Sequence, residues 1–289
     1  SLKWYFARRL TRLEPPYLVA LGSFFVLKQL VAGASGHELL PHLLASSLYS
    51  HNLAYGYEST ISIVTWSLEV EVQFYILAPL LGRLFAIRSV VSRRAALTVA
   101  ASCASVCAAF VNPEEAPRYF LSLSGFIQFF LFGFLLADVY LVDWAGRSPR
   151  TSALWDAVGL AAFAALCPLV FYAYADAPGR VVAPLLTFVF GVAAFKGRAL
   201  AWLFTRPAIF TIGGMCYSIY LWHSLPLHAV EHGMNGLGLS GWPRIALETA
   251  LGMLGVLALS TLVFVLIERP CMDKRWPQKL ILALRGRPP

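Results

Sequence analysis

Two carboxylates lie inside the apolar stretch WSLEVEVQFY, residues 66–75. Successive helical residues are about 100° apart, so Glu69 and Glu71 point to opposite sides of a helix. Ser67, Glu71 and Tyr75 recur every four residues and share one helix face. Acids in a membrane segment are costly, and this polar face favours a functional role for Glu71. The alternative is a structural acid bonded between helices.

A histidine provides the second candidate. His223 lies deep in the apolar stretch GGMCYSIYLWHSLPL, residues 213–227, and Tyr220 precedes it by about one turn. The imidazole titrates near neutral pH and serves widely as a general base. A single histidine between helices is more often a hydrogen-bonded packing residue, so both roles stay open.

Three arginines precede the first long apolar stretch. Arg8, Arg9 and Arg12 lie in ARRLTRLEPPY, residues 7–17, and Arg9 and Arg12 share a helix face. Guanidinium groups suit planar, bidentate phosphate binding, so the cluster can hold a phosphorylated donor. A topology signal or a contact with anionic lipid is the simpler explanation from the sequence alone.

The elements that position these residues are membrane spans. The chain is 58% apolar and only 13% charged, about half the charge of a soluble domain. A span needs about 20 mostly apolar residues. We predict an all-α fold, a polytopic transmembrane helical bundle with about eight spans. The predicted spans are 16–32, 61–82, 95–111, 120–142, 153–172, 180–195, 207–229 and 245–267.

Basic residues set the predicted orientation. Lysines and arginines gather in alternate connections, which places both ends of the chain in the cytoplasm and makes 268–289 a short basic tail. The 33–60 connection has neither residue type, so we interpret 37–55 as an outer-face loop or a surface-lying helix. The net charge of +8 is spread between apolar runs, so we expect no nucleic-acid partner.

Cysteines and small residues give structural expectations only. Cys103, Cys107, Cys167 and Cys216 lie in apolar segments, without partners at metal-binding spacing, and are interpreted as unpaired core residues. We expect no metal and no bound cofactor. Gly133 and Ala137, four residues apart, predict close helix packing.

Five stretches together resemble the membrane acyltransferase family 3, the integral-membrane O-acyltransferases. RRLTRLEPPY is similar to the family's Arg-Arg-x-x-Arg segment, and WSLEVEVQFY to its Trp-Ser-Leu-x-x-Glu-x-x-Phe-Tyr motif. In that motif Glu71 is the acid and Glu69 holds a variable position. FLFGFLLA, GGMCYSIYLWHSLP (with Cys216 where Ser is usual) and IERP complete the set. Their order and spacing indicate one family domain over 1–289.

The resemblance implies a reaction. An acyl group, expected to be acetyl, passes from cytoplasmic acyl-CoA to a hydroxyl of a carbohydrate, lipid-linked glycan or similar acceptor, in a bacterial inner membrane. Glu71 would orient the base or bind the acceptor, and His223 would be its partner or the base. The remaining roles are oxyanion donors (Tyr75, Tyr220), substrate binding (Trp66, Ser67) and CoA phosphate binding (Arg8, Arg9, Arg12).

The chain departs from the family at its beginning. The resemblance implies two preceding helices, the first with an Arg and a candidate catalytic His. Either this chain is a piece that starts after them, as the first residue Ser1 favours, or the protein has lost that base. Two other functions fit the residues: a transporter or flippase for an anionic or polyisoprenyl-linked substrate, and a non-catalytic membrane scaffold. The oligomeric state is not indicated.

Overall fold

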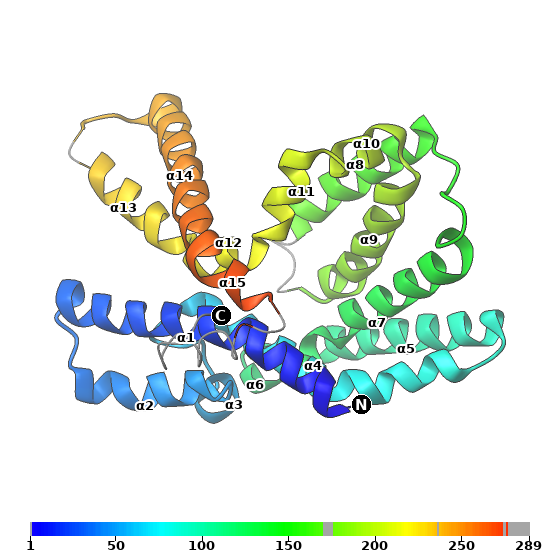
Figure 1. Cartoon of the computed structure of the whole chain (residues 1–289), viewed down its shortest axis with the longest axis horizontal. Helices are drawn as coiled ribbons and strands as arrows, with labels where there is room; N and C mark the ends of the chain where they lie inside the picture. The colour runs from blue at the N-terminus through cyan, green and yellow to red at the C-terminus, as the bar shows by residue number, and fades with distance from the viewer. Residues whose placement is uncertain (1, 170–175, 236, 274–275, 277–289) are drawn as a thin grey trace. The chain divides into compact units, whose positions relative to one another are not determined.

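The computed structural model describes residues 2–169, 176–235, 237–273 and 276 (Figure 1). Every regular element of these residues is helical, which confirms the predicted all-α class, and Ser152 and Gly197 form an isolated bridge. The chain divides into two compact units. The first contains the described residues of Ser1–Leu48, Ser59–Thr65 and Thr211–Pro289, and the second contains Tyr49–Glu58 and Trp66–Phe210.

The first unit is built around the long helix α1. Its elements are α1 (Leu2–Ala32), α2 (Gly36–Ser47), η1 (Ile63–Thr65), the end of α11 (Pro207–Gly214), α12 (Cys216–Trp222), α13 (Ser224–Met234), α14 (Gly241–Val263), η5 (Phe264–Glu268) and α15 (Arg269–Cys271). Helix α1 is held to α2 by the buried Tyr17, whose hydroxyl donates to the carbonyl of Ser46 at 2.8 Å. The Ser46 hydroxyl bonds that of Ser59 at 2.7 Å, which brings the 59–65 segment into this unit.

Small residues let α13 approach α14. A side-chain carbon added at Gly252 would lie 2.8 Å from Leu227, and one added at Gly255 would lie 3.0 Å from Pro226. The spacing of Gly133 and Ala137 predicts close packing on α7, and this is wrong at Gly133: an added carbon there meets no described atom within 4 Å. The spacing of small residues along a sequence shows where another helix could pack closely. The arrangement of the helices decides at which of these positions one does.

The second unit holds the segment with the two carboxylates. Its elements are α3 (His51–Tyr55), α4 (Trp66–Leu81), η2 (Gly82–Ala86), α5 (Val90–Phe110), α6 (Pro117–Phe120), α7 (Leu123–Val139), η3 (Tyr140–Trp144), α8 (Ala153–Pro168), α9 (Ala177–Lys196), α10 (Arg198–Phe204) and the start of α11. The 37–55 stretch therefore forms helices α2 and α3, not an irregular loop.

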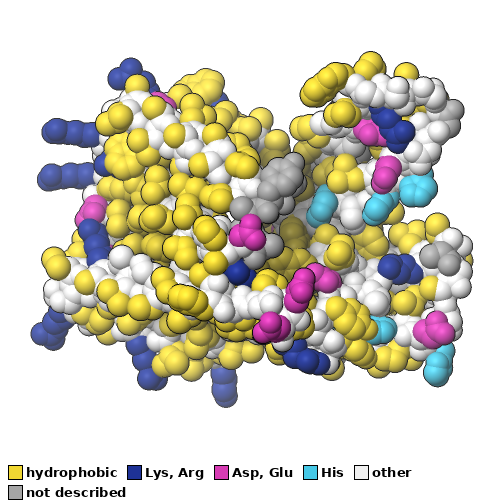
Figure 2. Space-filling model, turned by 180° about the vertical axis from the view of Figure 1, so that it is seen from behind, with side chains coloured by type: hydrophobic (Ala, Val, Ile, Leu, Met, Phe, Trp, Pro, Cys, Tyr) yellow, Lys and Arg dark blue, Asp and Glu magenta, His cyan; other side chains and the backbone are white. Residues whose placement is uncertain are grey.

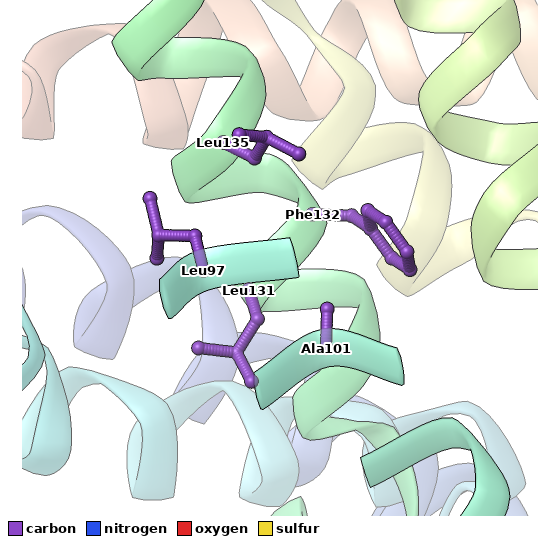
Figure 3. Packing of buried hydrophobic residues seen from close by; sticks show 5 residues of the cluster. All are labelled: Leu97, Ala101, Leu131, Phe132 and Leu135. Carbon is purple, nitrogen blue, oxygen red and sulfur yellow. The ribbon is translucent and has the colours of Figure 1, made fainter. Parts of the chain in front are cut away.

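The core of the second unit lies between α5 and α7 (Figure 3). Leu97 and Ala101 are four residues apart on α5, and Leu131 and Leu135 are four apart on α7, so each pair presents one stripe to the other helix. Phe132 continues the cluster toward α9. Lipid is as apolar as these side chains, so close packing, not escape from water, holds the helices together.

An ion cluster ties the same two helices at one end. Asp138 of α7 is 1% exposed and accepts from Arg93 and Arg94 of α5, the latter at 2.8 Å. Arg94 also donates to Asp143 at 3.0 Å, and Arg93 donates to the carbonyl of Ile87 at 2.7 Å. Charges buried this deeply must be paired, so the cluster fixes how α5 and α7 meet.

Five helices of the described residues are long and apolar enough to cross a membrane. They are Ile63–Ala86, Val90–Phe110, Pro117–Trp144, Ala177–Lys196 and Gly241–Cys271. Ala153–Pro168 is apolar but shorter, the predicted 207–229 span is divided among α11, α12 and α13, and 170–172 lie outside the described residues. The predicted count of about eight is not confirmed. Hydrophobic side chains form large areas of the face in Figure 2, as contact with lipid requires.

The cysteines in the apolar segments lie partly on the surface of the protein. All five are free, but Cys103, Cys107 and Cys216 are exposed, so the prediction that they are core residues is wrong for these three. In a membrane protein an apolar stretch can face lipid as well as the core, and hydropathy does not separate the two.

Candidate active site

Helix α4 presents the predicted acid and its neighbour as a pair. The Tyr75 hydroxyl donates to the Glu71 carboxylate, as expected for residues four apart on one helix face. Both side chains are half-buried, so they remain accessible to a substrate. Helix α4 runs through Pro79 to Leu81, which places the pair in its middle.

The beginning of α4 is held firmly. The Trp66 ring packs on Phe126 of α7, with 5.2 Å between ring centroids, and its carbonyl accepts from the Asn52 amide at 2.9 Å. Asn52 also donates to the carbonyl of Leu121 at 3.2 Å. Ser67 follows and is half-buried one turn before Glu71. The predicted substrate-binding residues therefore begin a helix that is anchored to two other segments.

Glu69 binds the backbone at the start of α3. It is fully buried and accepts from the backbone amides of His51 at 3.0 Å and Asn52 at 2.8 Å. These amides begin α3, where a negative charge is favoured, and Arg118 donates to the carbonyls of Leu53 and Ala54 at the other end. The predicted separation of the two acids is confirmed, and Glu69 holds the 49–58 segment in the second unit.

Gly56 completes this arrangement. It ends α3 with φ of 77°, a left-handed conformation that glycine adopts at no steric cost, and its amide bonds the carbonyl of Asn52 at 2.8 Å. A side-chain carbon at this position would also lie 3.5 Å from the Arg118 guanidinium. Sequence reasoning missed the whole α3 connection, although the polar pair His51–Asn52 and the leftover Glu69 were its visible signals.

In the first unit, α12 carries Tyr220 and leads into His223. The Nδ1 atom of His223 lies 2.7 Å from the carbonyl oxygen of Tyr220. A carbonyl only accepts, so this hydrogen bond requires the proton on Nδ1 and leaves the lone pair of the neutral ring on Nε2. The ring is half-buried, and in this tautomer Nε2 is the nitrogen that can accept a proton.

Side chains of three residues fix α12 by hydrogen bonds to other segments. The Tyr217 hydroxyl donates to the carbonyl of Leu13 at 3.0 Å, and the Tyr220 hydroxyl donates to that of Val64 at 2.5 Å. Between them, the amide and hydroxyl of Ser218 donate to Glu268 at 3.1 and 2.6 Å. Glu268 is 1% exposed, so the acid of the IERP stretch positions α12 from the end of the last long helix.

The predicted arginines line a cavity. Arg8, Arg9 and Arg12 of α1 border a hollow of 690 Å³ together with Trp4 and Tyr5, and Cys271, Met272 and Asp273 contribute to its wall. This volume lies within the usual range for small-molecule sites, about 300–1,000 Å³. The indole of Trp276 donates to the Thr11 carbonyl at 2.8 Å, which ties the predicted 268–289 tail to α1. The other residues from 274 onward lie outside the described part.

The site residues thus form three groups. The structure brings Glu71 together with Tyr75, His223 with Tyr220, and the three arginines around one cavity. The first group belongs to the second unit, and the other two belong to the first. Among the described residues, no three His, Cys, Asp or Glu side chains gather as metal ligands would.

The remaining evidence comes from comparison with known proteins. A family model described as an acyltransferase domain, that of acyltransferase family 3, matches residues 1–269. No curated protein and no solved structure gives a match. The matched range includes the three arginines of α1, the WSLEVEVQFY helix, α12 and Glu268. The chain belongs to acyltransferase family 3, a family of membrane enzymes that transfer acyl groups to hydroxyls.

Proposed function

We propose that the protein is a membrane-bound O-acyltransferase that moves an acyl group, acetyl in the simplest case, from cytoplasmic acyl-CoA to a hydroxyl. The acceptor would be a carbohydrate, a lipid-linked glycan or a similar molecule. Family membership supports acyl transfer, and the five long apolar helices support a membrane location. A bacterial inner membrane with both chain ends in the cytoplasm is part of the proposal.

The arginine cavity is the observation that carries the donor assignment. Among the described residues, three guanidinium groups and one carboxylate line its 690 Å³, which leaves an excess of positive charge. Neither Arg8 nor Arg12 takes part in an ion pair with the described acids. Coenzyme A carries several phosphates, and arginine binds phosphate through paired, charge-assisted hydrogen bonds. The cavity has the charge and the size that this donor needs.

The proposed reaction requires a base, an oxyanion donor and alignment of both substrates. The base removes the proton of the acceptor hydroxyl as its oxygen attacks the thioester carbon. The tetrahedral oxyanion then collapses, the carbon–sulfur bond breaks, and the base returns the proton to the leaving thiolate. An ester and free coenzyme A result, so no oxidant, reductant or metal is consumed.

The observed hydrogen bonds refine the proposed roles. Nε2 of His223 carries the lone pair of the neutral ring, which suits either a base or a partner of one. Tyr75 donates to Glu71 and Tyr220 to Val64, so each hydroxyl must exchange this acceptor before it can donate to an oxyanion. We therefore assign Tyr75 first to holding Glu71, and Glu71 to orienting the acceptor or the base.

The test is acyl transfer from radiolabelled acetyl-CoA in membranes that contain the protein. We expect Glu71→Gln to lower kcat by about 10²–10⁴-fold, the usual contribution of proton transfer or its positioning. Glu248→Gln, at a half-buried glutamate of α14 outside the three groups, is the matched control and should keep full activity. Full activity in Glu71→Gln would refute the assigned role. Movement of the acceptor across the membrane without acyl-CoA would instead identify a transporter.

A further inference from the structure

The first turns of α1 carry aromatic rings and guanidinium groups in register. Trp4, Arg8 and Arg12 follow one another at intervals of four residues, and Tyr5 and Arg9 form a parallel pair on the adjoining face. All five line the 690 Å³ cavity. Each step of four residues advances about 6 Å along the helix, so the rings lie at one end of the arginine row.

The rings of Tyr5 and Trp4 have different surroundings. The Arg9 guanidinium lies over the Tyr5 ring, 5.7 Å from its centroid, so this ring is engaged in a cation–π contact. The Trp4 side chain is 70% exposed although it borders the cavity. A large indole beside a hollow offers a flat face for stacking, and nucleobases stack on aromatic side chains next to basic residues that hold their phosphates.

The cavity is positively charged along α1 and carries a negative charge where residues 271–273 line it. Asp273 follows α15, and its carboxylate is the one acid among the described residues that line the hollow. A phosphate is repelled by this group and attracted to the arginines, so an anionic ligand lies with its phosphates along α1. Amino and hydroxyl groups of a nucleoside are donors, and they tolerate a neighbouring carboxylate.

We propose that this cavity is a nucleotide subsite in which Trp4 stacks on the base while Arg8, Arg9 and Arg12 hold the phosphates. The inference rests on the proposed function, because two of the three phosphates of acyl-CoA belong to its adenosine 3′,5′-bisphosphate unit. It adds Trp4, which lies outside the arginine motif, to the donor site. It also means that the protein recognises the nucleotide end of the donor by its base as well as by its charge. An anionic lipid headgroup shares the phosphate chemistry but has no base.

The experiment measures equilibrium binding to the purified protein in nanodiscs of neutral phosphatidylcholine. The probes are adenosine 3′,5′-bisphosphate, which has the base, and inorganic pyrophosphate, which lacks it. Stacking of one base is worth about 1–3 kcal/mol, so Trp4→Ala should weaken bisphosphate binding about 5–150-fold and leave pyrophosphate binding unchanged. Trp4→Phe should retain most of the affinity. Trp242→Ala removes an indole that is 83% exposed on α14, and it should change neither affinity.

The triple variant Arg8→Ala, Arg9→Ala, Arg12→Ala separates this inference from the proposed function. It should weaken both probes, because both depend on the phosphates. If the triple variant loses both probes but Trp4→Ala loses neither, the base subsite is refuted and the donor site stands. If the wild-type protein binds neither probe and the triple variant keeps the wild-type KM for acetyl-CoA, the donor site fails too.

A lipid site predicts a different pattern. Nanodiscs with phosphatidylglycerol would compete with both probes, and Trp4→Ala would then weaken neither or both equally. Either result overturns the nucleotide subsite. A loss confined to the bisphosphate in Trp4→Ala, with Trp4→Phe and Trp242→Ala binding normally, supports it, because a merely structural tryptophan would affect the two probes alike.

Discussion

At the scale of single residues, two glutamates two positions apart on α4 have opposite surroundings. Glu71 is half-buried and bonded to one hydroxyl, whereas Glu69 is fully buried and bonded to two backbone amides. A hydroxyl can donate or accept, so it adapts to a change of partner, but an amide N–H only donates. The same substitution should therefore have different consequences at the two positions.

We predict that Glu69→Gln lowers the thermal unfolding midpoint of the detergent-purified protein by several degrees. The glutamine has one acceptor oxygen for two amides, and its NH₂ group faces a buried donor, which costs about 1–3 kcal/mol. Glu71→Gln is the matched control, because Tyr75 can reverse its hydrogen bond, and it should unfold near the wild-type temperature while losing activity. Equal midpoints for Glu69→Gln and the wild type would contradict the role of Glu69.

At the scale of helices, hydrogen bonds from acidic side chains, two of them buried, supply what the hydrophobic effect does not supply in lipid. Asp138 joins α7 to α5, Glu268 joins the last long helix to α12, and Asp156 of α8 accepts from three amides at the start of α10. Each tie connects elements that also pack on one another. Such ties specify which faces meet, since a buried charge without its partner is costly.

The α5–α7 tie can be tested with two aspartates that share one arginine. Asp138→Asn leaves the 8%-exposed Arg93 without its anion, which costs about 3–5 kcal/mol and should lower the unfolding midpoint by about 6 °C or more. Asp143 pairs with Arg94 near the surface, with its own side chain 42% exposed, so Asp143→Asn should cost at most about 1 kcal/mol. Similar midpoints for both variants would show that the buried pair does not hold the helices.

At the scale of the whole molecule, the described residues form two compact units, each with its own share of the family's motifs. The WSLEVEVQFY helix belongs to one unit, and the arginine segment, α12 and IERP belong to the other. The 49–58 segment interrupts the first unit's stretch of chain to join the second. The proposed roles in acyl transfer are therefore divided between the two units, with Glu71 in one and His223 and the arginines in the other.

Membrane topology is the prediction that belongs to this scale. The helix Pro117–Trp144 has 28 residues and reaches about 42 Å, enough to cross a bilayer. In a chain whose five cysteines are replaced by alanine, an impermeant maleimide should label Glu114→Cys in intact cells and Gly146→Cys only after permeabilisation. Both positions are exposed. Labelling of both from the same side would exclude the proposed orientation of this helix.

The sequence by itself determined whatever depends on neighbours along one helix. The Glu71–Tyr75 pair and the separation of Glu69 follow from helical periodicity, and the apolar runs predict an all-α membrane protein. The motifs that identify the family are also local stretches. These features were predictable because the partners lie within a turn or two of each other.

Only the tertiary structure decided which distant residues donate hydrogen bonds to the buried acids. Glu69 meets amides 17 and 18 positions away, Asp138 meets arginines 44 and 45 away, and Glu268 meets Ser218 from 50 away. Asp273 closes the arginine cavity from the other end of the chain. Hydropathy and periodicity show that a buried acid needs a partner, but the partner is chosen by the packing of helices, which no local pattern encodes.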